Sequence, residues 1–370
     1  MAVDDEFDMK HLRFLILIFS VGAAQAQVPA DIEAGLRKIG RIVDPSCTAK
    51  LYRPLMPKND ISRSVTPLYP GITIARDVSF GPDSKDVIDI FTADRGGENR
   101  TVLIFVPGGP GNKTEQQDKN TIAFYDNIGR WASKNGMVGV LMQRHPGQNW
   151  NDPAKDVSTM IQWLQANISK YKGNPNRMFI WCQSAGNGPV GTYIGRPELY
   201  GPKGVGVVGA IFMSGAWNIA PLNVPPQPGG GFREAFANAG SNCGGSTPFA
   251  ADGAISGPSR ATAIPLGAVG SAAASQPDAA TQLERSTLPA FRTTKVKLLF
   301  VSAELDPGIN DGKMSAFYQT LHDDLCKLGA DHCPAMLFAK GHSHMSELFS
   351  IDTADTSVSG TILKWMKGVK

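Results

Sequence analysis

Ser184 carries the strongest signal for nucleophilic chemistry in this chain. It ends the apolar, strand-like run 178–183, and small or turn-tolerant residues separate it from a helix-compatible stretch at 189–194. A serine on a sharp turn between a strand and a helix has an exposed hydroxyl, and the N–H groups that begin the helix point toward the atom it attacks. Such a turn predicts a nucleophile. The alternative, an ordinary connection between a strand and a helix, predicts no chemistry.

A glycine-rich turn lies one strand-helix-strand unit before Ser184. The run 101–106 is apolar and rich in β-branched residues, which is the pattern of a strand buried on both faces. It breaks into Pro-Gly-Gly-Pro-Gly at 107–111. Glycines in such a turn let the backbone approach a ligand closely and adopt positive φ angles. A plain turn is the alternative, and the position before Ser184 argues against it.

Asp306 follows another strand-like run, at 295–302. A carboxylate just past the end of a late strand lies at the edge where α/β sheets bind ligands, and there it can accept a hydrogen bond from a histidine. The alternative is a turn-forming role, because Asp306 begins an Asp-Pro-Gly sequence. Glu304 is a rival carboxylate in the same turn.

The histidine that would complete a triad follows the last strand-like run, at 334–339. Two candidates, His342 and His344, stand there. The other histidines beyond the amino-terminal region lie on or beside a predicted surface helix, or after the predicted strand 137–143, and are His322, His332 and His145. His145 either lines the site or ends its strand.

From about Gly71 to Lys370 the chain resembles α/β-hydrolases of the carboxylesterase–lipase group, near the esterases that carry Ser-Ala-Gly at the nucleophile. Their nucleophile motif is Gly-x-Ser-x-Gly, and here Cys182 replaces the first glycine. The turn at 107–111 stands where these enzymes carry His-Gly-Gly-Gly, and it is more similar to the His-Gly-Gly-Pro-Gly of proline iminopeptidase-like hydrolases. Pro107 replaces the histidine of both versions.

The resemblance implies a role for each of these residues. Ser184, Asp306 and His344 would form the catalytic triad, in the chain order that this family uses. His344 is preferred as the base because the family's histidine precedes an apolar residue, and His342 would support the loop. The oxyanion hole would consist of the Gly109 and Ala185 N–H groups, next to Gly108, since Pro110 has no N–H to donate.

The resemblance also covers 152–176. There Asp156 is expected to open a helix with apolar residues at helical spacing, and to form structural bonds near the oxyanion loop. The implied fold is α/β: a mainly parallel, doubly wound sheet with an irregular cap insertion. Segments 72–80 and 86–92 would form its antiparallel edge.

Composition agrees with one α/β-hydrolase domain at 27–370. The net charge is +3 and the basic residues are scattered, so nothing suggests a nucleic-acid partner. The segment 223–282 is rich in Gly, Ala, Ser and Pro and lacks a clear period. It predicts a cap over about 223–290 that shapes the pocket, with Trp217 and Phe232, or else a flexible surface excursion.

The amino terminus predicts export. Lys10 and Arg13 precede a short apolar run, and Ala-Gln-Ala at 24–26 is a cleavage site, so 1–26 reads as a secretory signal peptide and the protein as secreted or periplasmic. The acidic stretch 1–8 would be an upstream extension. The apolar run is too short for a transmembrane anchor.

Five cysteines leave at least one unpaired, and Cys182 is the expected free thiol. Cys326 and Cys333 predict a short disulfide, and Cys47 and Cys243 a possible second one. No cofactor is expected, and no Cys/His spacing indicates a metal site.

The predicted function is hydrolysis of a small-molecule ester: a neutral carboxylic ester with a short or medium acyl chain, or an aryl ester. The oligomeric state does not follow from the sequence. Two alternatives stay open, a proline iminopeptidase-like peptidase or amidase, and a non-catalytic binding protein with a hydrolase-like fold.

Overall fold

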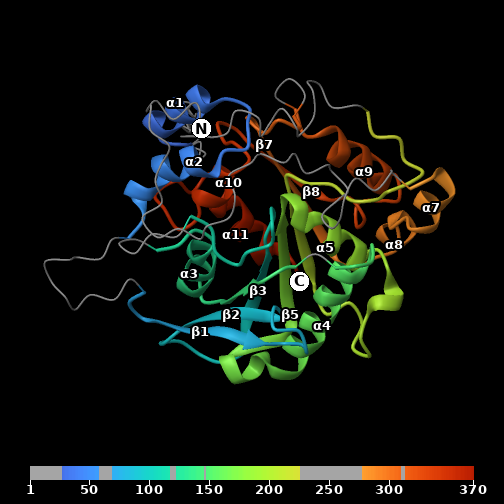
Figure 1. The fold of residues 1–370 in the computed structure, drawn as a ribbon, viewed down its shortest axis with the longest axis horizontal. Coiled ribbons are helices and arrows are strands. Elements are labelled where there is room, and N and C mark those ends of the chain that lie inside the picture. Colours follow the sequence, from blue (N-terminus) through green and yellow to red (C-terminus); the bar gives the residue numbers. More distant parts are fainter. Residues whose placement is uncertain (1–26, 58–68, 117–121, 146, 226–276, 310–312) are drawn as a thin grey trace, which may run out of the picture.

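The computed structural model describes residues 27–57, 69–116, 122–145, 147–225, 277–309 and 313–370. Within these ranges, eight strands form one sheet with the order β1-β2-β4-β3-β5-β6-β7-β8 (Figure 1). The strands are β1 (Ile72–Ser79), β2 (Val87–Ala93), β3 (Arg100–Val106), β4 (Val138–Met142), β5 (Gly173–Gln183), β6 (Gly209–Met213), β7 (Lys297–Ala303) and β8 (Ala335–Ala339).

The sheet is mainly parallel. From β4 through β3 and β5 to β8, each neighbouring pair is parallel, whereas β1 pairs with β2, and β2 with β4, in the antiparallel sense. The predicted antiparallel edge at 72–80 and 86–92 is therefore confirmed. All parallel strands have their carboxyl ends at one edge, which brings together the turns that follow β3, β5, β7 and β8.

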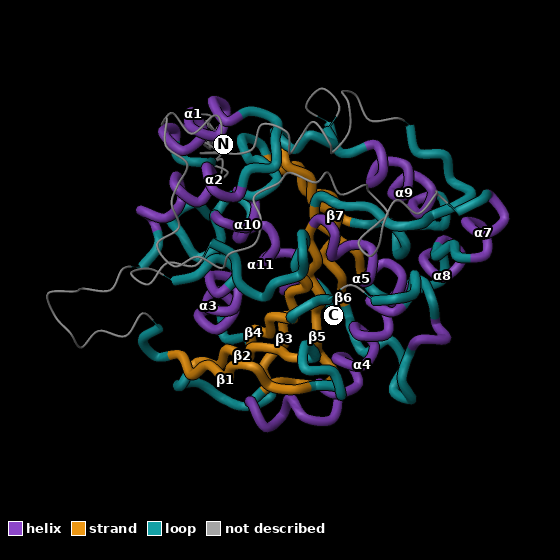
Figure 2. Tube along the Cα trace, viewed as in Figure 1, coloured by secondary structure: helices purple, strands orange, loops and turns teal. Residues whose placement is uncertain are grey.

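Helices cover both faces of the sheet (Figures 1 and 2). One face packs against α1 (Ala30–Ile39), α2 (Pro45–Tyr52), α3 (Asp126–Lys134), α10 (Ser346–Phe349) and α11 (Ser359–Gly368). The other packs against α4 (Asp152–Asn167), α5 (Asn187–Ile194), α8 (Leu288–Phe291) and α9 (Ala316–Cys326), and α7 (Ala279–Glu284) lies before α8. The 3₁₀ turns are η1 (Arg53–Leu55), η2 (Ile168–Tyr171), η3 (Ser184–Gly186) and η4 (Pro197–Leu199).

Strand β5 shows why the central strands read as continuous apolar runs. Phe179 and Trp181 enter the core on one face, while Met178, Ile180 and Cys182 enter the core on the other. Side chains alternate between the two faces of a strand, and here both faces are buried. This two-sided burial holds the end of β5 in place.

Helix α4 begins earlier than predicted. Its first residue is Asp152, so Asp156 lies inside the helix and does not open it. Pro153 explains the difference, because a proline in the first turn of a helix loses no hydrogen bond. No helix of the described residues is long and apolar enough to cross a bilayer.

The expected pocket role of Trp217 is wrong. Its side chain is 8% exposed and stacks on Phe212, with ring centroids 4.2 Å apart. Phe291 and Phe317 also pack against it, so Trp217 belongs to the core between the sheet and helices α8 and α9. Phe232, most of the expected cap (226–276) and the expected signal peptide (1–26) lie outside the described residues.

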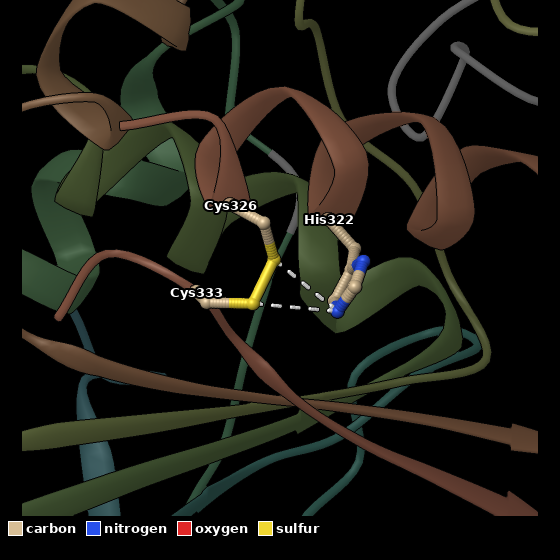
Figure 3. Close-up of side chains that lie close together, drawn as sticks. All are labelled: His322, Cys326 and Cys333. Atoms are coloured by element: carbon tan, nitrogen blue, oxygen red, sulfur yellow. Dashed lines mark hydrogen bonds between the residues drawn. A yellow bond between two sulfur atoms is a disulfide. The ribbon is translucent and has the colours of Figure 1, made fainter. Parts of the chain in front are cut away.

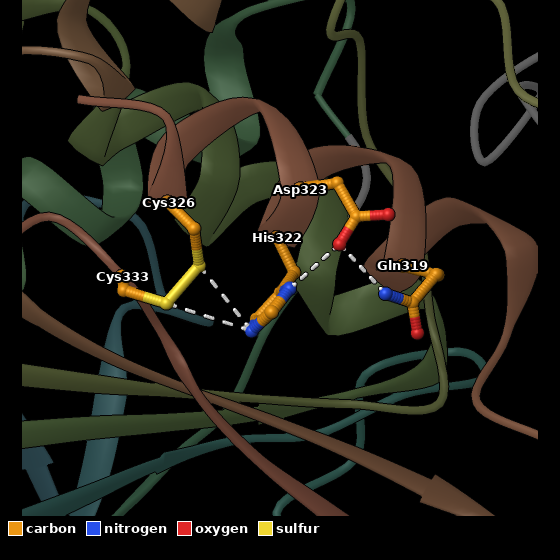
Figure 4. The surroundings of a disulfide bond; sticks show 5 residues. All are labelled: Gln319, His322, Asp323, Cys326 and Cys333. Atoms are coloured by element: carbon orange, nitrogen blue, oxygen red, sulfur yellow. Dashed lines mark hydrogen bonds and ion pairs between the residues drawn. A yellow bond between two sulfur atoms is a disulfide. The ribbon is translucent and has the colours of Figure 1, made fainter. Parts of the chain in front are cut away.

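The predicted disulfide between Cys326 and Cys333 is present and joins the end of α9 to the segment before β8 (Figure 3). His322, one turn earlier on α9, points its Nε2 atom at both sulfur atoms, and its Nδ1 atom faces Asp323 at 3.0 Å (Figure 4). Cys47 is also disulfide-bonded. Its expected partner, Cys243, lies outside the described residues.

Candidate active site

Ser184 lies on a strained turn between β5 and α5. Its φ angle is +52°, in the left-handed region that residues with a side chain rarely adopt. The turn η3 begins at Ser184 and continues directly into α5, so the Ala185 N–H belongs to the first helical turn, where backbone donors have no partner within the helix. Asn187 holds the turn, because its Nδ2 donates to the Ser184 carbonyl at 2.9 Å and to the Met213 carbonyl at 2.9 Å.

The glycine-rich turn after β3 packs directly against this serine. A Cβ atom built on Gly108 would lie 2.7 Å from Ser184 Cβ, and one on Gly186 would lie 2.5 Å from the Val106 carbonyl oxygen. Side chains at these two positions would force the two turns apart. Gly109, with φ +50°, is exposed next to this contact. The structure thus brings Gly108, Gly109, Ser184 and Ala185 together at the carboxyl edge of β3 and β5.

Arg144 holds the carbonyl groups of the glycine-rich turn, a role that the sequence analysis missed. Its guanidinium donates to the carbonyl oxygen of Pro107 at 3.1 Å, to that of Gly108 at 3.4 Å and to that of Gly109. The side chain is 1% exposed, and burial lowers the pKa of Arg144 to about 10. A charged residue just after β4 is the only signal in the sequence for this role.

Asp306 and His344 form a buried pair. His344 Nδ1 lies 2.5 Å from Asp306 Oδ2, and the two side chains are 1% and 5% exposed. The second oxygen of Asp306 accepts from the Gly308 N–H at 2.8 Å, which fixes the carboxylate within the turn after β7. This pairing holds the imidazole in one orientation and leaves Nε2 as the nitrogen for a reacting proton.

Gln183 connects the histidine loop to the serine strand. Its Nε2 donates to the His344 carbonyl oxygen at 3.0 Å, and the side chain is 1% exposed. Because Ser184 is the next residue, this bond joins the strand end that carries the serine to the loop that carries the histidine.

The rival residues have other partners. His342 is fully buried, with Nδ1 at 3.0 Å from Ser346 Oγ and Nε2 at 2.7 Å from Ser357 Oγ. Burial lowers the pKa of His342. Glu304 accepts from the Gly341 N–H at 2.8 Å and pairs with Arg37 of α1 at 3.2 Å. This geometry favours His344 and Asp306 as the reacting pair, with His342 and Glu304 inside the framework of the loop.

Helices α1 and α2, which the resemblance did not cover, support this framework. Besides the Arg37 contact, the Tyr52 hydroxyl donates to Asp355 Oδ2 at 3.0 Å, and Asp355 lies 3.6 Å from His342. The Asp44 side chain caps α2 by accepting from the Cys47 N–H. The amino-terminal helices therefore contact Glu304 and Asp355, which in turn contact the histidine loop.

Among the residues that the structure describes, two clusters contain groups of the types that bind metals, apart from the disulfide with His322. In the first cluster, His145, which directly follows Arg144 in the chain, has its Nε2 atom 3.2 Å from Asp86 and 3.4 Å from Asp156. Desolvation, with the nearby Asp86, Asp152 and Asp83, raises the pKa of Asp156 to about 6 despite His145. The second cluster, Asp306, His344 and Glu347, includes the buried pair itself.

Cys182 is a buried free thiol beneath the serine turn. Its Sγ lies 3.4 Å from the Ile211 carbonyl oxygen and 3.6 Å from Asn187 Oδ1. Burial raises the pKa of Cys182 well above its usual range, so this thiol is neutral and packs as a small apolar group. The larger side chain of Cys182, at the position of the first glycine in the Gly-x-Ser-x-Gly motif, thus fits next to the backbone of β6.

No family model and no curated protein matches the chain at the sequence level. Solved structures do match its fold. A carboxyl esterase 2 from the mycorrhizal fungus Tuber melanosporum has a TM-score of 0.52 and 15% identity, over 83% of this chain and 90% of that one. Esterase B from Lactobacillus rhamnosis, inhibited by a tributyrin phosphonate, has a TM-score of 0.51 and 10% identity, over 92% and 94%. A carbohydrate esterase from gut microbiota has a TM-score of 0.50 and 12% identity, over 80% and 95%.

The chain has the α/β-hydrolase fold. The predicted fold class is therefore confirmed, with a mostly parallel sheet and helices on both faces. In this fold the nucleophile lies after the central strand, and the acid and histidine come from later strand ends. Ser184 after β5, Asp306 after β7 and His344 after β8 occupy those places.

Proposed function

We propose that this α/β-hydrolase is a serine esterase that uses Ser184, His344 and Asp306. The observation that carries the proposal is the buried His344–Asp306 hydrogen bond, in a loop that Gln183 ties to the strand end bearing Ser184. A histidine oriented by a carboxylate, in a loop bonded to the strand end of a serine on a strained turn, supports an assignment to nucleophilic acyl transfer.

In the proposed mechanism, the Ser184 hydroxyl attacks the ester carbonyl and His344 Nε2 takes its proton. Asp306 stabilises the imidazolium that forms. The Gly109 and Ala185 N–H groups stabilise the negative charge on the carbonyl oxygen, and Arg144 fixes the turn that presents Gly109. His344 then returns the proton to the departing alcohol, an acyl-serine remains, and water activated by the same histidine releases the acid.

The proposed substrates are neutral carboxylic esters with short or medium acyl chains, or aryl esters. The neutral Cys182 and the exposed Gly109 near Ser184 add no charge to the serine turn. No carboxylate pair was found in the sequence that would hold a free substrate amine. Proline peptides and anilides should therefore be poorer substrates than esters.

We also propose that the protein is exported. The sequence 1–26 has the pattern of a cleaved signal peptide, and the Cys326–Cys333 disulfide is of the kind that persists in oxidising compartments.

The experiment that tests the proposed function combines serine labelling with a substrate panel. A fluorophosphonate probe should label the wild-type protein and the surface control Ser79→Ala, but not Ser184→Ala. The panel compares p-nitrophenyl acetate, butyrate and palmitate with proline p-nitroanilide. Faster cleavage of the anilide would support the iminopeptidase alternative, and absence of labelling would support a non-catalytic binding protein.

A further inference from the structure

Glu347 places a second carboxyl group beside the Asp306–His344 pair. It lies in α10, three residues after His344, and its side chain is fully buried. A carboxyl oxygen of Asp306, a carboxyl oxygen of Glu347 and a ring nitrogen of His344 lie within 4.8 Å of one another. Because it is not part of the proposed triad, this acid needs its own explanation.

Hydrogen bonds connect Glu347 to the ends of two neighbouring strands, β5 and β6. Its Oε2 accepts from the Ser214 hydroxyl at 3.0 Å, at the end of β6. Its carboxyl group also bonds to the Gln183 side chain, which donates to the His344 carbonyl oxygen. Its other oxygen, Oε1, has no hydrogen-bond partner among the described residues. Glu347 therefore joins the ends of β5 and β6 to the histidine loop.

The charges around Glu347 do not favour an anion. Asp306 and His344 face it from the loops after β7 and β8, and Tyr318 faces it from α9. Within the ranges that the structure describes, no lysine or arginine pairs with Glu347. A buried carboxylate without a cation, beside the carboxylate of Asp306, is strongly unfavourable. Burial, followed by the charge of Asp306, raises the pKa of Glu347 well above its usual range.

We propose that Glu347 is a neutral carboxylic acid in the working enzyme and a positioning residue for His344. Because Glu347 is neutral, Asp306 is the one anion next to His344 in this cluster. The bond from Glu347 to Gln183 fixes the position of the His344 backbone. This inference rests on the proposed function for the role of His344, whereas the neutral state of Glu347 does not depend on it.

The protonation state can be measured without any substrate. Infrared difference spectroscopy at pH 8 compares the wild-type protein with Glu347→Gln. We expect the wild type to show the carbonyl stretch of a protonated carboxylic acid that the variant lacks. Absence of this band from the wild type would overturn the proposal, even if Ser184 proves to be the nucleophile.

The pH profile of kcat/KM provides a second test. An anion beside His344 would favour the protonated imidazole, so its removal in Glu347→Gln would extend activity to lower pH. A neutral Glu347 predicts that the acid limb keeps its position in this variant. A shift of the acid limb by about one pH unit or more toward lower pH would show that Glu347 is ionised.

The positioning role is tested by Glu347→Ala. We expect kcat to fall by roughly 10- to 100-fold with little change in KM, and Glu347→Gln to recover most of the loss because an amide can still bond to Gln183 and Ser214. Full activity in Glu347→Ala, or equal losses in both variants, would contradict the positioning role. The infrared test decides the neutral state even if the alanine variant does not fold.

Discussion

His344 Nδ1 and Asp306 Oδ2 lie 2.5 Å apart although 38 positions separate the two residues in the chain. The contact forms because β7 and β8 are parallel neighbours, so the turns that follow them meet at the same edge of the sheet. Each partner is anchored separately, Asp306 by the Gly308 N–H and the His344 backbone by Gln183. Both partners are therefore held in one geometry, as the proposed transfer of a proton from Ser184 to His344 requires.

Replacing Asp306 by asparagine should abolish most of the esterase activity. Asparagine keeps the shape but favours the wrong tautomer of His344 and cannot stabilise the imidazolium, so we expect kcat to fall on the order of 10³- to 10⁴-fold. Kinetics on p-nitrophenyl butyrate measure the effect. Glu304→Gln is the matched control, because Glu304 lies in the same turn as Asp306 but pairs with Arg37 of α1. This variant should lose less than about threefold in kcat. If Glu304→Gln were the more damaging change, the assignment of the acid would be wrong.

The two neighbouring histidines should fail in different ways. His344→Ala removes the proposed base, so kcat/KM should fall on the order of 10³-fold or more even in protein that remains folded. His342→Ala instead removes a fully buried ring that bonds to the hydroxyl groups of Ser346 and Ser357, and we expect it to lower the thermal midpoint. Activity assays and thermal unfolding by circular dichroism on both variants separate these roles. The reverse pattern would make His342 the base.

Much of the fold could be predicted because its central strands are buried on both faces. The run 101–106 lies within one residue of β3, which is buried on both faces, and the run 334–339 lies within one residue of β8, a partly buried edge strand. Such runs are continuous and apolar, and turn-forming residues follow them. The turns after these strands gave the candidate residues, and the resemblance to α/β-hydrolases gave their expected roles.

The supporting residues could not be predicted, for a physical reason. Arg144 and Glu347 are charged residue types, and their complete burial depends on partners far away in the chain, such as the Pro107 carbonyl for Arg144 and Ser214 for Glu347. A local sequence pattern contains no information on such partners. Helix α1 was missed for the same reason, since its contact with the histidine loop arises only in the folded chain.

Stability should respond to pH through Asp156. Its pKa in the folded protein, about 6, is above the ordinary value of 3.8, so the folded state holds a proton that the unfolded state releases. Protonated Asp156 therefore stabilises the folded state. This contribution is complete below about pH 4 and is lost as the pH rises through about 6. Asp156→Asn should therefore raise the thermal midpoint at pH 8 relative to the wild type, and have little effect at pH 4.

Asp152 provides a control of opposite sign in the same helix. Hydrogen bonds from the backbone at Asn149 lower the pKa of Asp152 to about 2, so its ionised form supports the folded state above the ordinary pKa. Asp152→Asn should lower the thermal midpoint at pH 8. Equal shifts of the same sign in both variants would contradict the electrostatic explanation and indicate a general change in α4.

Arg144→Lys should weaken the oxyanion hole. The guanidinium of Arg144 binds the carbonyl groups of three consecutive residues, 107–109, and so fixes the direction in which the Gly109 N–H points. Lysine keeps a positive charge but lacks the planar fork needed to hold these groups together. We expect kcat to fall by roughly 10²-fold, comparable to the loss of one oxyanion donor, with a smaller change in KM.

Arg100→Lys is the control that separates this effect from a loss of stability. Arg100 is also buried and also donates to three carbonyl groups, those of Gly97, Ala93 and Arg95, but it lies at the start of β3, away from the carboxyl edge. Its replacement should lower the thermal midpoint as much as that of Arg144 and leave kcat unchanged. If both variants lost kcat equally, the effect of Arg144 would be one of general stability. If Arg144→Lys kept full kcat, the Gly109 N–H would not depend on the guanidinium.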